Sequence, residues 1–279
     1  MSGVRIQEDQ VRFFEKEGYL VVKELLSADE VELLRNAAVA DKALDEHSFS
    51  VRDGEGGAAR LALWNHPGSS IYGMIARCET VVGAMERLLG EEVYHYHSKM
   101  IMKDARTGGA WTWHQDYGYW YHNGVLSPDL ASISIAIDPS TRENGCLQVI
   151  PKSHRLGRIE HTLTGNQAGA DMARVEKILE RLPVEYVVLD PGDAVVFHSN
   201  MLHRSDANTS DKPRWSMICC YNTASNDPYL DEPHARYTKL NKVPDSAIRE
   251  AGRKRMEEET GDVAWMRKDN TGTKHLPEK

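Results

Sequence analysis

The segment Trp111-Thr112-Trp113-His114-Gln115-Asp116 carries the side chains of this sequence that are best suited to chemistry. In an extended chain, residues i and i+2 point to the same side, so the His114 imidazole and the Asp116 carboxylate are expected on one face. Two imidazoles and one carboxylate on one side of an Fe(II) ion form a facial triad, which leaves the opposite coordination positions open. Because the chain has 12 histidines and a His-x-Asp pair is a weak signal, this interpretation depends on a third ligand.

A second histidine-containing segment follows a later apolar run and offers two candidates for that ligand, His198 and His203. We favour His203, because Ser205 and Arg214 follow it at a spacing that suits a carboxylate-bearing cofactor. A guanidinium forks onto a carboxylate, and a hydroxyl beside it adds a hydrogen bond. A 2-oxoglutarate molecule that chelates the metal presents such a carboxylate at its far end, and His198 is then expected to support the site or the core.

Aromatic side chains crowd around these candidates, namely Trp111, Trp113, Tyr117, Tyr119, Trp120 and Tyr121. Packing within a sheet explains them as well as a pocket does; the second hypothesis is an aromatic wall that holds a cationic group. His95 and His97 share a strand face and are an alternative metal pair, although core or pocket packing is the simpler interpretation. The side chains predicted to line a substrate pocket are His97, Tyr117, Tyr119 and Trp120.

The elements that must position these groups change in character near residue 92. Before it, a helix from Gln10 ends at Gly18, and Tyr19–Val22 reads as a strand. A capping box at Ser27-Ala28-Asp29-Glu30 opens a second helix, and a further amphipathic helix is expected over residues 70–89. Residues 47–65 are rich in Gly, Arg and Asp and are predicted to be a mobile loop; whether residues 45–60 close over the pocket as a lid stays open.

After residue 92 the apolar residues alternate, which predicts a mostly β fold. The expected strands are Val93–Met102, Ala131–Asp138, Leu147–Ile150, Tyr186–Leu189, Ala194–His198 and Trp215–Tyr221, with one helix near Ala170–Leu182. Strands of this spacing behind N-terminal helices predict a double-sheet jelly roll faced by helices. We expect a single domain over residues 1–240, with a helical face (1–90) and a jelly-roll core (about 92–222). A charged tail (241–279) is expected to be helical or partly disordered, with Ala264-Trp265-Met266 docking back.

Composition excludes several classes of protein. The chain has 279 residues, a net charge of −8, 41% hydrophobic and 27% charged residues, which is typical of a globular protein rather than a disordered one. It has no apolar run of the ~20 residues that span a bilayer, no signal-peptide core, and no dominant basic block for nucleic acid. Four irregularly placed cysteines indicate reduced thiols. We therefore expect a cytoplasmic protein, monomeric or a small homo-oligomer, without nucleic-acid or membrane partners.

The motifs together resemble the phytanoyl-CoA dioxygenase (PhyH) superfamily of Fe(II)/2-oxoglutarate-dependent oxygenases. The resemblance is carried by His114-x-Asp116, by His203-x-Ser205, and by Arg214 eleven positions after that histidine. The opening Phe14–Val22 and the segment Pro151–Arg155 add to it, and the likeness covers about residues 8–222. The chain is similar to the ectoine-hydroxylase-like and aminophosphonate-oxidising small-molecule members.

This resemblance implies a double-stranded β-helix fold of the cupin type, with Fe(II) and 2-oxoglutarate as cofactors and O₂ as co-substrate. The iron ligands that it implies are His114, Asp116 and His203. It also implies that Arg214 binds the tail carboxylate of 2-oxoglutarate, with Ser205 as hydroxyl partner and Lys99 as a polar contact to cofactor or substrate. Family halogenases have a small residue at the carboxylate position, so Asp116 implies hydroxylation.

The resemblance also narrows the substrate. Tyr94–Asp116 aligns without gaps with ectoine hydroxylases, but His97 and Ile101 stand where those enzymes have glutamine and asparagine. Cations for an aminophosphonate are offered by Lys99, Lys103, Arg106 and Arg204. We expect hydroxylation of a small polar metabolite, either a zwitterionic amino-acid-like compound or a 2-aminoethylphosphonate-like compound, with release of succinate and CO₂.

Three alternatives remain. The first is an acyl-CoA hydroxylase of the same superfamily, for which no basic cluster suited to CoA phosphates is evident. The second is a cupin-like metal-dependent lyase or isomerase, which would use the metal as a Lewis acid and have no need of the Arg214 carboxylate anchor. The third is a non-catalytic binding module, which would have lost a metal ligand.

Overall fold

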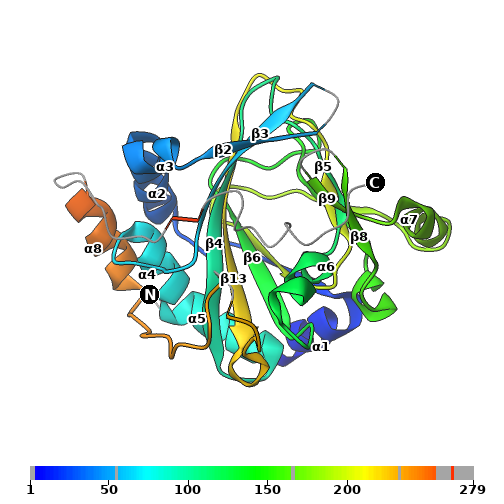
Figure 1. Ribbon diagram of the computed structural model, residues 1–279. Coiled ribbons are helices and arrows are strands. Elements are labelled where there is room, and N and C mark those ends of the chain that lie inside the picture. The colour runs from blue at the N-terminus through cyan, green and yellow to red at the C-terminus, as the bar shows by residue number, and fades with distance from the viewer. Residues whose placement is uncertain (1–3, 54–55, 165–166, 232–233, 256–264, 267–279) are drawn as a thin grey trace.

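Two antiparallel β-sheets lie on either side of a cavity, and helices cover the outer face of the larger sheet (Figure 1). The structure is a computed structural model that describes residues 4–53, 56–164, 167–231, 234–255 and 265–266. Within these residues, the larger sheet has the strand order β1-β11-β6-β13-β4-β3-β2 and the smaller sheet the order β10-β7-β12-β5. This arrangement agrees with the predicted jelly roll faced by helices.

Most strands that pair with each other in the two sheets are not consecutive in the sequence. Those of the larger sheet are β1 (Tyr19–Val22), β2 (Phe49–Arg52), β3 (Ala58–Trp64), β4 (Val93–Lys103), β6 (Leu130–Ala136), β11 (Ala194–His198) and β13 (Arg214–Thr223). Those of the smaller sheet are β5 (Trp111–His114), β7 (Leu147–Val149), β10 (Glu185–Val187) and β12 (His203–Ser205), and β8 (His161–Thr164) pairs with β9 (Gln167–Ala170) as a separate hairpin.

Helices gather mainly on one side of the larger sheet, at the left of Figure 1. They are α1 (Glu8–Glu17), α2 (Ala28–Ala40), α3 (Lys42–Glu46), α4 (Ile71–Arg77), α5 (Glu79–Leu89), α6 (Asp116–Trp120), α7 (Met172–Leu179) and α8 (Ser246–Arg255). α6 lies beside the smaller sheet and α7 beyond the β8–β9 hairpin. No helix of the described residues is both long enough and apolar enough to cross a membrane.

The period-two pattern of the strands separates the helix-covered core from the cavity. On β6 and β13, Ile133, Ile135 and Met217 pack against the helices. Their neighbours in sequence, Ser134 and Ile218, line the cavity instead. β6 and β13 thus contribute one face to hydrophobic stability and the other to the site.

Several predicted elements are confirmed in detail. Strands β1 and β11 have the predicted bounds, and the capping box of α2 is present: Glu30 N donates to Ser27 Oγ, and Ser27 N donates to the Glu30 carboxylate at 3.0 Å. Glu30 also accepts a hydrogen bond from Arg249 at 2.7 Å, which ties α8 to the N-terminal helices.

The predicted docking of the tail is confirmed for two residues. The Trp265 ring lies 5.5 Å from the Trp64 ring, and Met266 N donates to the Leu63 carbonyl at 2.8 Å. Ala264 and most of the tail that follows α8 lie outside the described residues.

Two predictions about local structure are wrong. The expected helix over 70–89 is two helices, because the backbone at Cys78 is extended (φ −66°, ψ 150°). The predicted mobile loop over 47–65 contains the β2–β3 hairpin, since Val51 and Leu61 are buried and β3 pairs with β4. Asp53 accepts hydrogen bonds from Gly57 N at 2.9 Å and Ala110 N at 3.0 Å, so the described ends of the turn between these two strands are tied in place.

Candidate active site

A strand-to-helix transition between the two sheets positions the His-x-Asp motif. His114 is the last residue of β5, and Asp116 is the first residue of α6. Across the smaller sheet, His114 is the direct antiparallel partner of His203, the first residue of β12. Residues directly opposed in such a ladder project to the same face, so the register itself brings the two imidazoles together.

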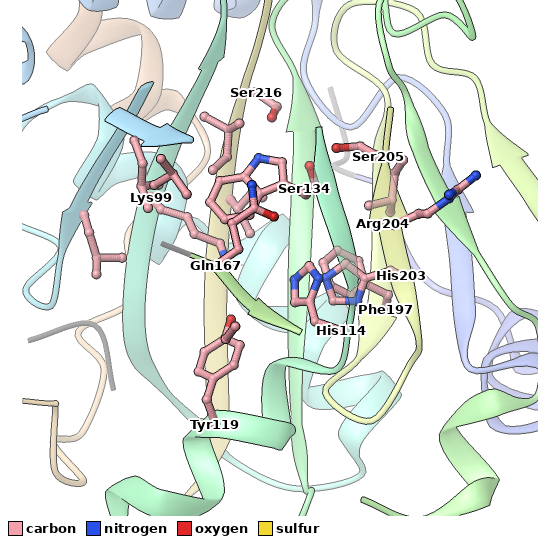
Figure 2. Close-up of a pocket in the computed structure, with 18 of the residues that line it drawn as sticks. Lys99, His114, Tyr119, Ser134, Gln167, Phe197, His203, Arg204, Ser205 and Ser216 are labelled. Atoms are coloured by element: carbon pink, nitrogen blue, oxygen red, sulfur yellow. The ribbon is translucent and has the colours of Figure 1, made fainter. Parts of the chain in front are cut away.

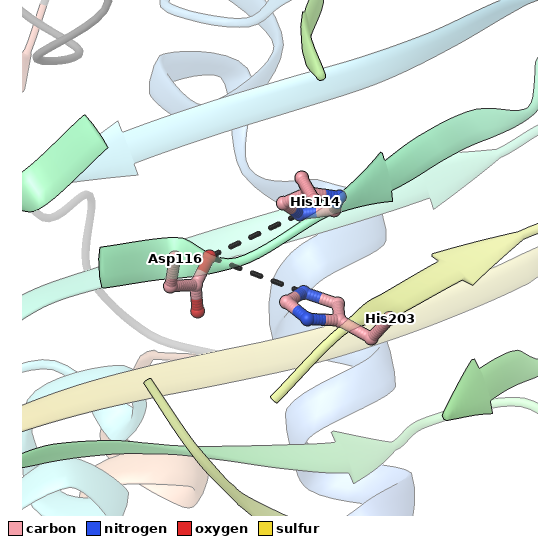
Figure 3. A group of neighbouring side chains, drawn as sticks. All are labelled: His114, Asp116 and His203. Atoms are coloured by element: carbon pink, nitrogen blue, oxygen red, sulfur yellow. Dashed lines mark ion pairs between the residues drawn. The ribbon is translucent and has the colours of Figure 1, made fainter. Parts of the chain in front are cut away.

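The three side chains converge on one point (Figure 3). One ligand atom from each of His114, Asp116 and His203 lies within 4.8 Å of the others, and both histidine Nε2 atoms are 4.0 Å from Asp116 Oδ1. Each Nδ1 is 2.8–2.9 Å from a backbone carbonyl two residues earlier, Thr112 for one ring and Met201 for the other. Since a carbonyl only accepts, Nδ1 carries the proton and the Nε2 lone pair of each ring faces the shared point.

The electrostatics of the cluster suit a cation. Burial lowers the pKa of both imidazoles below the usual range, which keeps them neutral. Burial alone would raise the pKa of Asp116, but Lys99 and the two histidines outweigh it, so this pKa is well below its usual value. Neutral imidazoles beside a charged carboxylate are the protonation states in which these groups bind a metal.

Asp116 is held by hydrogen-bond donors on both oxygens. Tyr119 Oη donates to Oδ1 at 2.6 Å and Ser132 Oγ donates to Oδ2 at 2.9 Å. Lys99 Nζ lies 3.8 Å from Oδ1. These contacts fix the orientation of a fully buried carboxylate, as outer contacts do around metal ligands.

Gln115, between the two ligand positions, is anchored to the neighbouring loops. Its backbone N donates to His161 Nε2 at 2.9 Å, and its side-chain amide donates to the carbonyls of Gly157 and Asn200 at 2.9 and 2.8 Å. Its side-chain oxygen accepts from Ile159 N at 2.7 Å. The backbone that carries the His-x-Asp motif is therefore rigidly placed before any ligand binds.

A cavity of about 150 Å³ opens beside the three ligand residues (Figure 2). Its lining comes from both sheets and includes Phe49, Val51, Leu61, Leu63, His97, Lys99, Ile101, Trp111, His114, Tyr119, Trp120, Ser134, Leu147, Gln167, Phe197, His203, Ser205, Arg214, Ser216 and Ile218. Hydroxyl groups of three serines, Ser134, Ser205 and Ser216, accompany Arg214 in this wall. Buried Arg214 Nε has no hydrogen-bond partner among the described residues, which fits a site built to receive an anion.

Most of the predicted site residues meet at this cavity. The three ligand candidates, Arg214, Ser205 and Lys99 all line or adjoin it, as do His97, Tyr119 and Trp120. Tyr117 does not line it: its ring packs in a separate cluster with Tyr96, and its hydroxyl donates to the Leu126 carbonyl at 2.7 Å. The pocket prediction for Tyr117 is therefore wrong, because its side chain packs in the cluster of Tyr96 and Trp120 and is not part of the cavity lining.

The alternative histidines lie elsewhere. His198 contacts the rings of Phe14 and His154, and its Nδ1 accepts from Asn200 N at 3.0 Å, so its ring belongs to the packing around α1. His95 Nε2 is 2.7 Å from Ser98 Oγ, and His95 is not part of the metal-ligand cluster found among the described residues.

Some residues of the site were not anticipated from the sequence. Ser132 and Ser134 alternate with apolar residues along β6, so polar residues on one phase of an otherwise apolar strand were an available signal. Gln167 lines the cavity from β9 while donating to the Ala110 carbonyl at 2.8 Å, which ties the hairpin to the start of β5. That contact joins segments far apart in the chain and leaves no local sequence pattern.

Comparisons with known proteins agree with this geometry. The family model described as "Phytanoyl-CoA dioxygenase (PhyH)" matches residues 14–216. The L-proline trans-4-hydroxylase of Streptomyces griseoviridis is 32% identical over 232 residues, which cover 76% of this chain and 85% of that protein. The ectoine dioxygenase of Stutzerimonas stutzeri is 27% identical over 241 residues, covering 81% and 80%.

Solved structures give the same result at the level of the fold. EctD from S. alaskensis, crystallised with 2-oxoglutarate and 5-hydroxyectoine, superposes with a TM-score of 0.73 at 25% identity, covering 88% of this chain and 91% of that one. The same protein has been crystallised with bound Fe, with a TM-score of 0.72. The carbocyclase SnoK, at 21% identity and a TM-score of 0.66, shares the fold.

The predictions of a jelly-roll fold, of a dioxygenase and of iron and 2-oxoglutarate as its cofactors are confirmed by these matches. The family model spans more than half of the chain, and its match includes both parts of the metal-ligand cluster and Arg214. This chain belongs to the phytanoyl-CoA dioxygenase family.

Proposed function

We propose that this protein hydroxylates a small amino-acid-like metabolite, with His114, Asp116 and His203 as the ligands of Fe(II) and Arg214 as the anchor of 2-oxoglutarate. The observation that carries the proposal is the convergence of the three ligand atoms within 4.8 Å at the wall of a cavity that also contains Arg214. When bound, the iron with 2-oxoglutarate and O₂ supplies the oxidation of a C–H bond to an alcohol, with release of succinate and CO₂.

The residues of the chain bind and orient the reactants. Arg214 keeps its positive charge, since burial lowers its pKa only to about 10, and Ser205 and Ser134 offer hydroxyls in the same wall. Lys99 lines the same cavity, 3.8 Å from Asp116, and can meet a carboxylate of cofactor or substrate. Asp116 is fully buried, so the surrounding side chains keep bulk water away from this carboxylate.

The cavity supports a small substrate. Its volume of about 150 Å³ is below the roughly 300–1,000 Å³ of pockets that hold drug-sized ligands. Apolar side chains such as Phe49, Leu61 and Ile101 surround a few polar groups, and Tyr119 and Trp120 are placed to face a cationic amine. Two relatives are named for small amino-acid-like substrates, proline and ectoine, and this composition suits a substrate of that class.

Cations for a phosphonate group are fewer than the sequence suggested. Of the four candidates, Lys99 and Arg204 line the cavity, whereas Lys103 lies behind its wall and donates to Ser205 Oγ and the Asp206 carbonyl. Arg204 Nε donates to Gln148 Oε1 at 2.9 Å, and its guanidinium lies 5.0 Å from the centre of the Trp113 ring. Arg106 forms an ion pair with Asp211. Lys99, which lines the cavity 3.8 Å from Asp116, is then the one candidate left to bind a phosphonate group. A single cation favours a zwitterion with a carboxylate over the aminophosphonate alternative.

The test is an anaerobic titration of the metal-free protein with Fe(II) and then 2-oxoglutarate. A weak visible metal-to-ligand charge-transfer band is expected, and it should be absent from Asp116→Ala. Small zwitterions, aminophosphonates and CoA thioesters are then screened for stimulation of succinate release. Stimulation by CoA thioesters alone, or a protein that acts on substrate without forming succinate, would contradict the proposal.

The cytoplasmic location, the monomeric or small homo-oligomeric state, and the single domain over residues 1–240 stay predictions. The same holds for closure of residues 45–60 over the cavity, where the described part is the β2–β3 hairpin. Residues 54–55 of that segment lie outside the described residues.

A further inference from the structure

Lys103 lies behind the cavity wall with no exposed surface, which is rare for a lysine. It is the last residue of β4 and the direct antiparallel partner of Arg214, the first residue of β13. Directly opposed residues project to the same face of a sheet. Two cationic side chains are therefore neighbours at the cavity end where the 2-oxoglutarate tail is proposed to bind, and burying a charge is costly unless something there binds it.

The hydrogen bonds of the Lys103 ammonium lead to that site. Lys103 Nζ donates to Ser205 Oγ at 2.8 Å and to the backbone carbonyl of Asp206. Ser205 is buried as well and lines the cavity, in the same wall as Arg214. Lys103 is thus connected to the cavity by its hydrogen bond to Ser205, which lines it.

The chemistry of the two groups fixes the direction of the Ser205 hydrogen. An ammonium has three N–H donors and no lone pair, whereas a hydroxyl has one donor and two acceptor positions. As long as Lys103 is protonated, Ser205 Oγ must accept from it, so the Ser205 hydrogen is left for another acceptor. With Lys103 on one side of the hydroxyl, the cavity is where that acceptor can be.

We propose that Lys103 is a positioning residue for 2-oxoglutarate: by donating to Ser205 Oγ, it directs the Ser205 hydrogen to the cofactor carboxylate that Arg214 binds. This inference rests on the proposed function of the cavity as a 2-oxoglutarate site. Lys103 does not touch the cofactor in this arrangement and acts through Ser205.

The charges around Lys103 add a pH dependence to the same arrangement. Burial, followed by the charge of Arg214, lowers the pKa of Lys103 to about 6, while Asp206 and Asp53 oppose this shift and Cys146 is the further titratable group that faces it. A carboxylate bound against Arg214 favours the ammonium and raises this pKa again. Binding of 2-oxoglutarate near neutral pH should therefore be accompanied by uptake of a proton at Lys103, which makes the affinity higher at pH 6.5 than at pH 8.

The test measures affinity rather than turnover. The Fe(II)-loaded protein is titrated anaerobically with 2-oxoglutarate by calorimetry, for the wild type, Lys103→Met, Ser205→Ala and the double variant. Each single change should raise the Kd about tenfold, and the second change in the double variant should add no more than about twofold, because both remove one interaction. Lys212→Met, at an exposed lysine just before β13, serves as the control and should leave the Kd unchanged.

The pH arm separates positioning from a purely structural role. Between pH 6.5 and 8 the Kd of the wild type should rise, by at most about tenfold per pH unit for one proton, and Lys103→Met should lose much of that rise. A Lys103→Met protein with a lowered Tm but with the wild-type Kd and pH slope would overturn the inference. So would fully additive effects of the two single changes.

Two further outcomes concern a Lys103 variant that does not fold and a wild-type protein that does not bind 2-oxoglutarate. If Lys103→Met does not fold, Lys103→Gln replaces it, since an amide keeps an N–H donor without a charge; the expected result is a smaller rise in Kd with loss of the pH slope. If the wild-type protein binds Fe(II) but not 2-oxoglutarate, the proposed function fails. If the wild type binds 2-oxoglutarate normally and the Lys103 variant has the same Kd, this inference is contradicted but the proposed function is not.

Discussion

Each imidazole of the candidate metal centre is fixed through its own backbone. His114 and His203 both donate Nδ1–H to the carbonyl two residues earlier, so the ring orientation and the free Nε2 are set by residues of the same strand or turn. The carboxylate of Asp116 depends instead on side chains from other elements or turns, Tyr119 and Ser132. Removal of a single ligand is therefore expected to leave the other two in place.

Replacement of the third ligand provides the most direct test at this scale. We expect His203→Ala to lose Fe(II) affinity by more than the roughly 10–100-fold that loss of an outer contact costs, because a coordination bond disappears. His198→Ala is the matched control, since His198 packs against Phe14 and His154 and should bind iron normally. Iron content after equilibrium dialysis distinguishes them; full iron in His203→Ala would contradict the assignment.

A second test concerns the two arginines of the cavity. Arg214→Met should raise the KM for 2-oxoglutarate on the order of 100-fold, because loss of a buried charged partner costs about 2–5 kcal/mol. Arg204→Met is the control, since that guanidinium is already bound to Gln148 and stacked on Trp113. Initial rates of succinate formation at varied 2-oxoglutarate give both values, and equal effects of the two changes would argue against the anchor role of Arg214.

The residues of the candidate site were largely predictable because their types and order are specific. His114, Asp116, His203, Ser205 and Arg214 were all placed at one site from the sequence and the family resemblance. Lys103 was named only as a possible cation for a phosphonate, and Gln167 was missed, since a lysine at the end of a strand or a glutamine in a hairpin has no distinctive spacing. Their roles depend on contacts between segments that only the folded chain brings together.

At the scale of elements, the transition from β5 to α6 has no room for an added side chain at Gly118. A Cβ built there would lie 2.0 Å from the ring of His161, the residue that accepts the backbone hydrogen bond of Gln115. The motif that carries His114 and Asp116 is thus packed directly on the β8 strand. Any enlargement at this point must displace either His161 or α6.

We therefore expect Gly118→Ala to destabilise the fold by about 1–3 kcal/mol, as overpacking does, and to weaken Fe(II) binding at the same time. Gly83→Ala in α5 is the matched control, because nothing lies within 4 Å of a Cβ at that position. Alanine is the better helix former, so this change should stabilise the protein by about 0.5–1 kcal/mol. Urea denaturation with iron titration checks both, and equal stability of the two variants would contradict the packing argument.

Elements with complete local signals were predicted well, and those that depend on distant partners were not. The capping box at Ser27 and the β-branched run of β11 specify their own structure. The three- and four-residue strands β12 and β5 are too short for a periodic pattern and exist because they pair with each other and, for β12, with β7. The glycines of residues 54–57 suggested mobility in the sequence, but Phe49–Arg52 and Ala58–Trp64 on either side of them pair as strands.

At the scale of the whole molecule, buried histidines make the stability sensitive to acid. Burial lowers the pKa of His161 to about 4 and that of His95 to about 3. In the unfolded chain the imidazole titrates near 6.5, so below that pH the unfolded state binds more protons than the folded state. The free energy of unfolding is therefore highest above about pH 6.5 and falls as the pH is lowered toward about 4.

Urea unfolding of the metal-free protein between pH 7.5 and 4.5 should show this decline. Each such histidine contributes a slope of up to about 1.4 kcal/mol per pH unit. His161→Gln, which retains an acceptor for Gln115 N, should lower the slope without abolishing folding at pH 7.5. A pH-independent free energy of unfolding in the wild type over this range would contradict the prediction.

The overall architecture was predictable for a different reason from the site. Alternating apolar residues and turn residues indicated a jelly roll, and the resemblance of a few motifs indicated the family. In the structure, two sheets around one cavity bring those motifs together. The division of residues 71–89 into two helices and the course of α6 depend on packing against the sheets. No local pattern determines them.

The hydrogen-bond donors around Asp116 are expected to keep their positions when its carboxylate is removed. In Asp116→Ala, the hydroxyls of Tyr119 and Ser132 would still point at the emptied space, and the two imidazoles would keep their places in the strand ladder. Such a space is a receptor for a small external anion. Formate added to this variant should restore part of its iron binding, so the protein offers a scaffold in which one coordination position can be filled from solution.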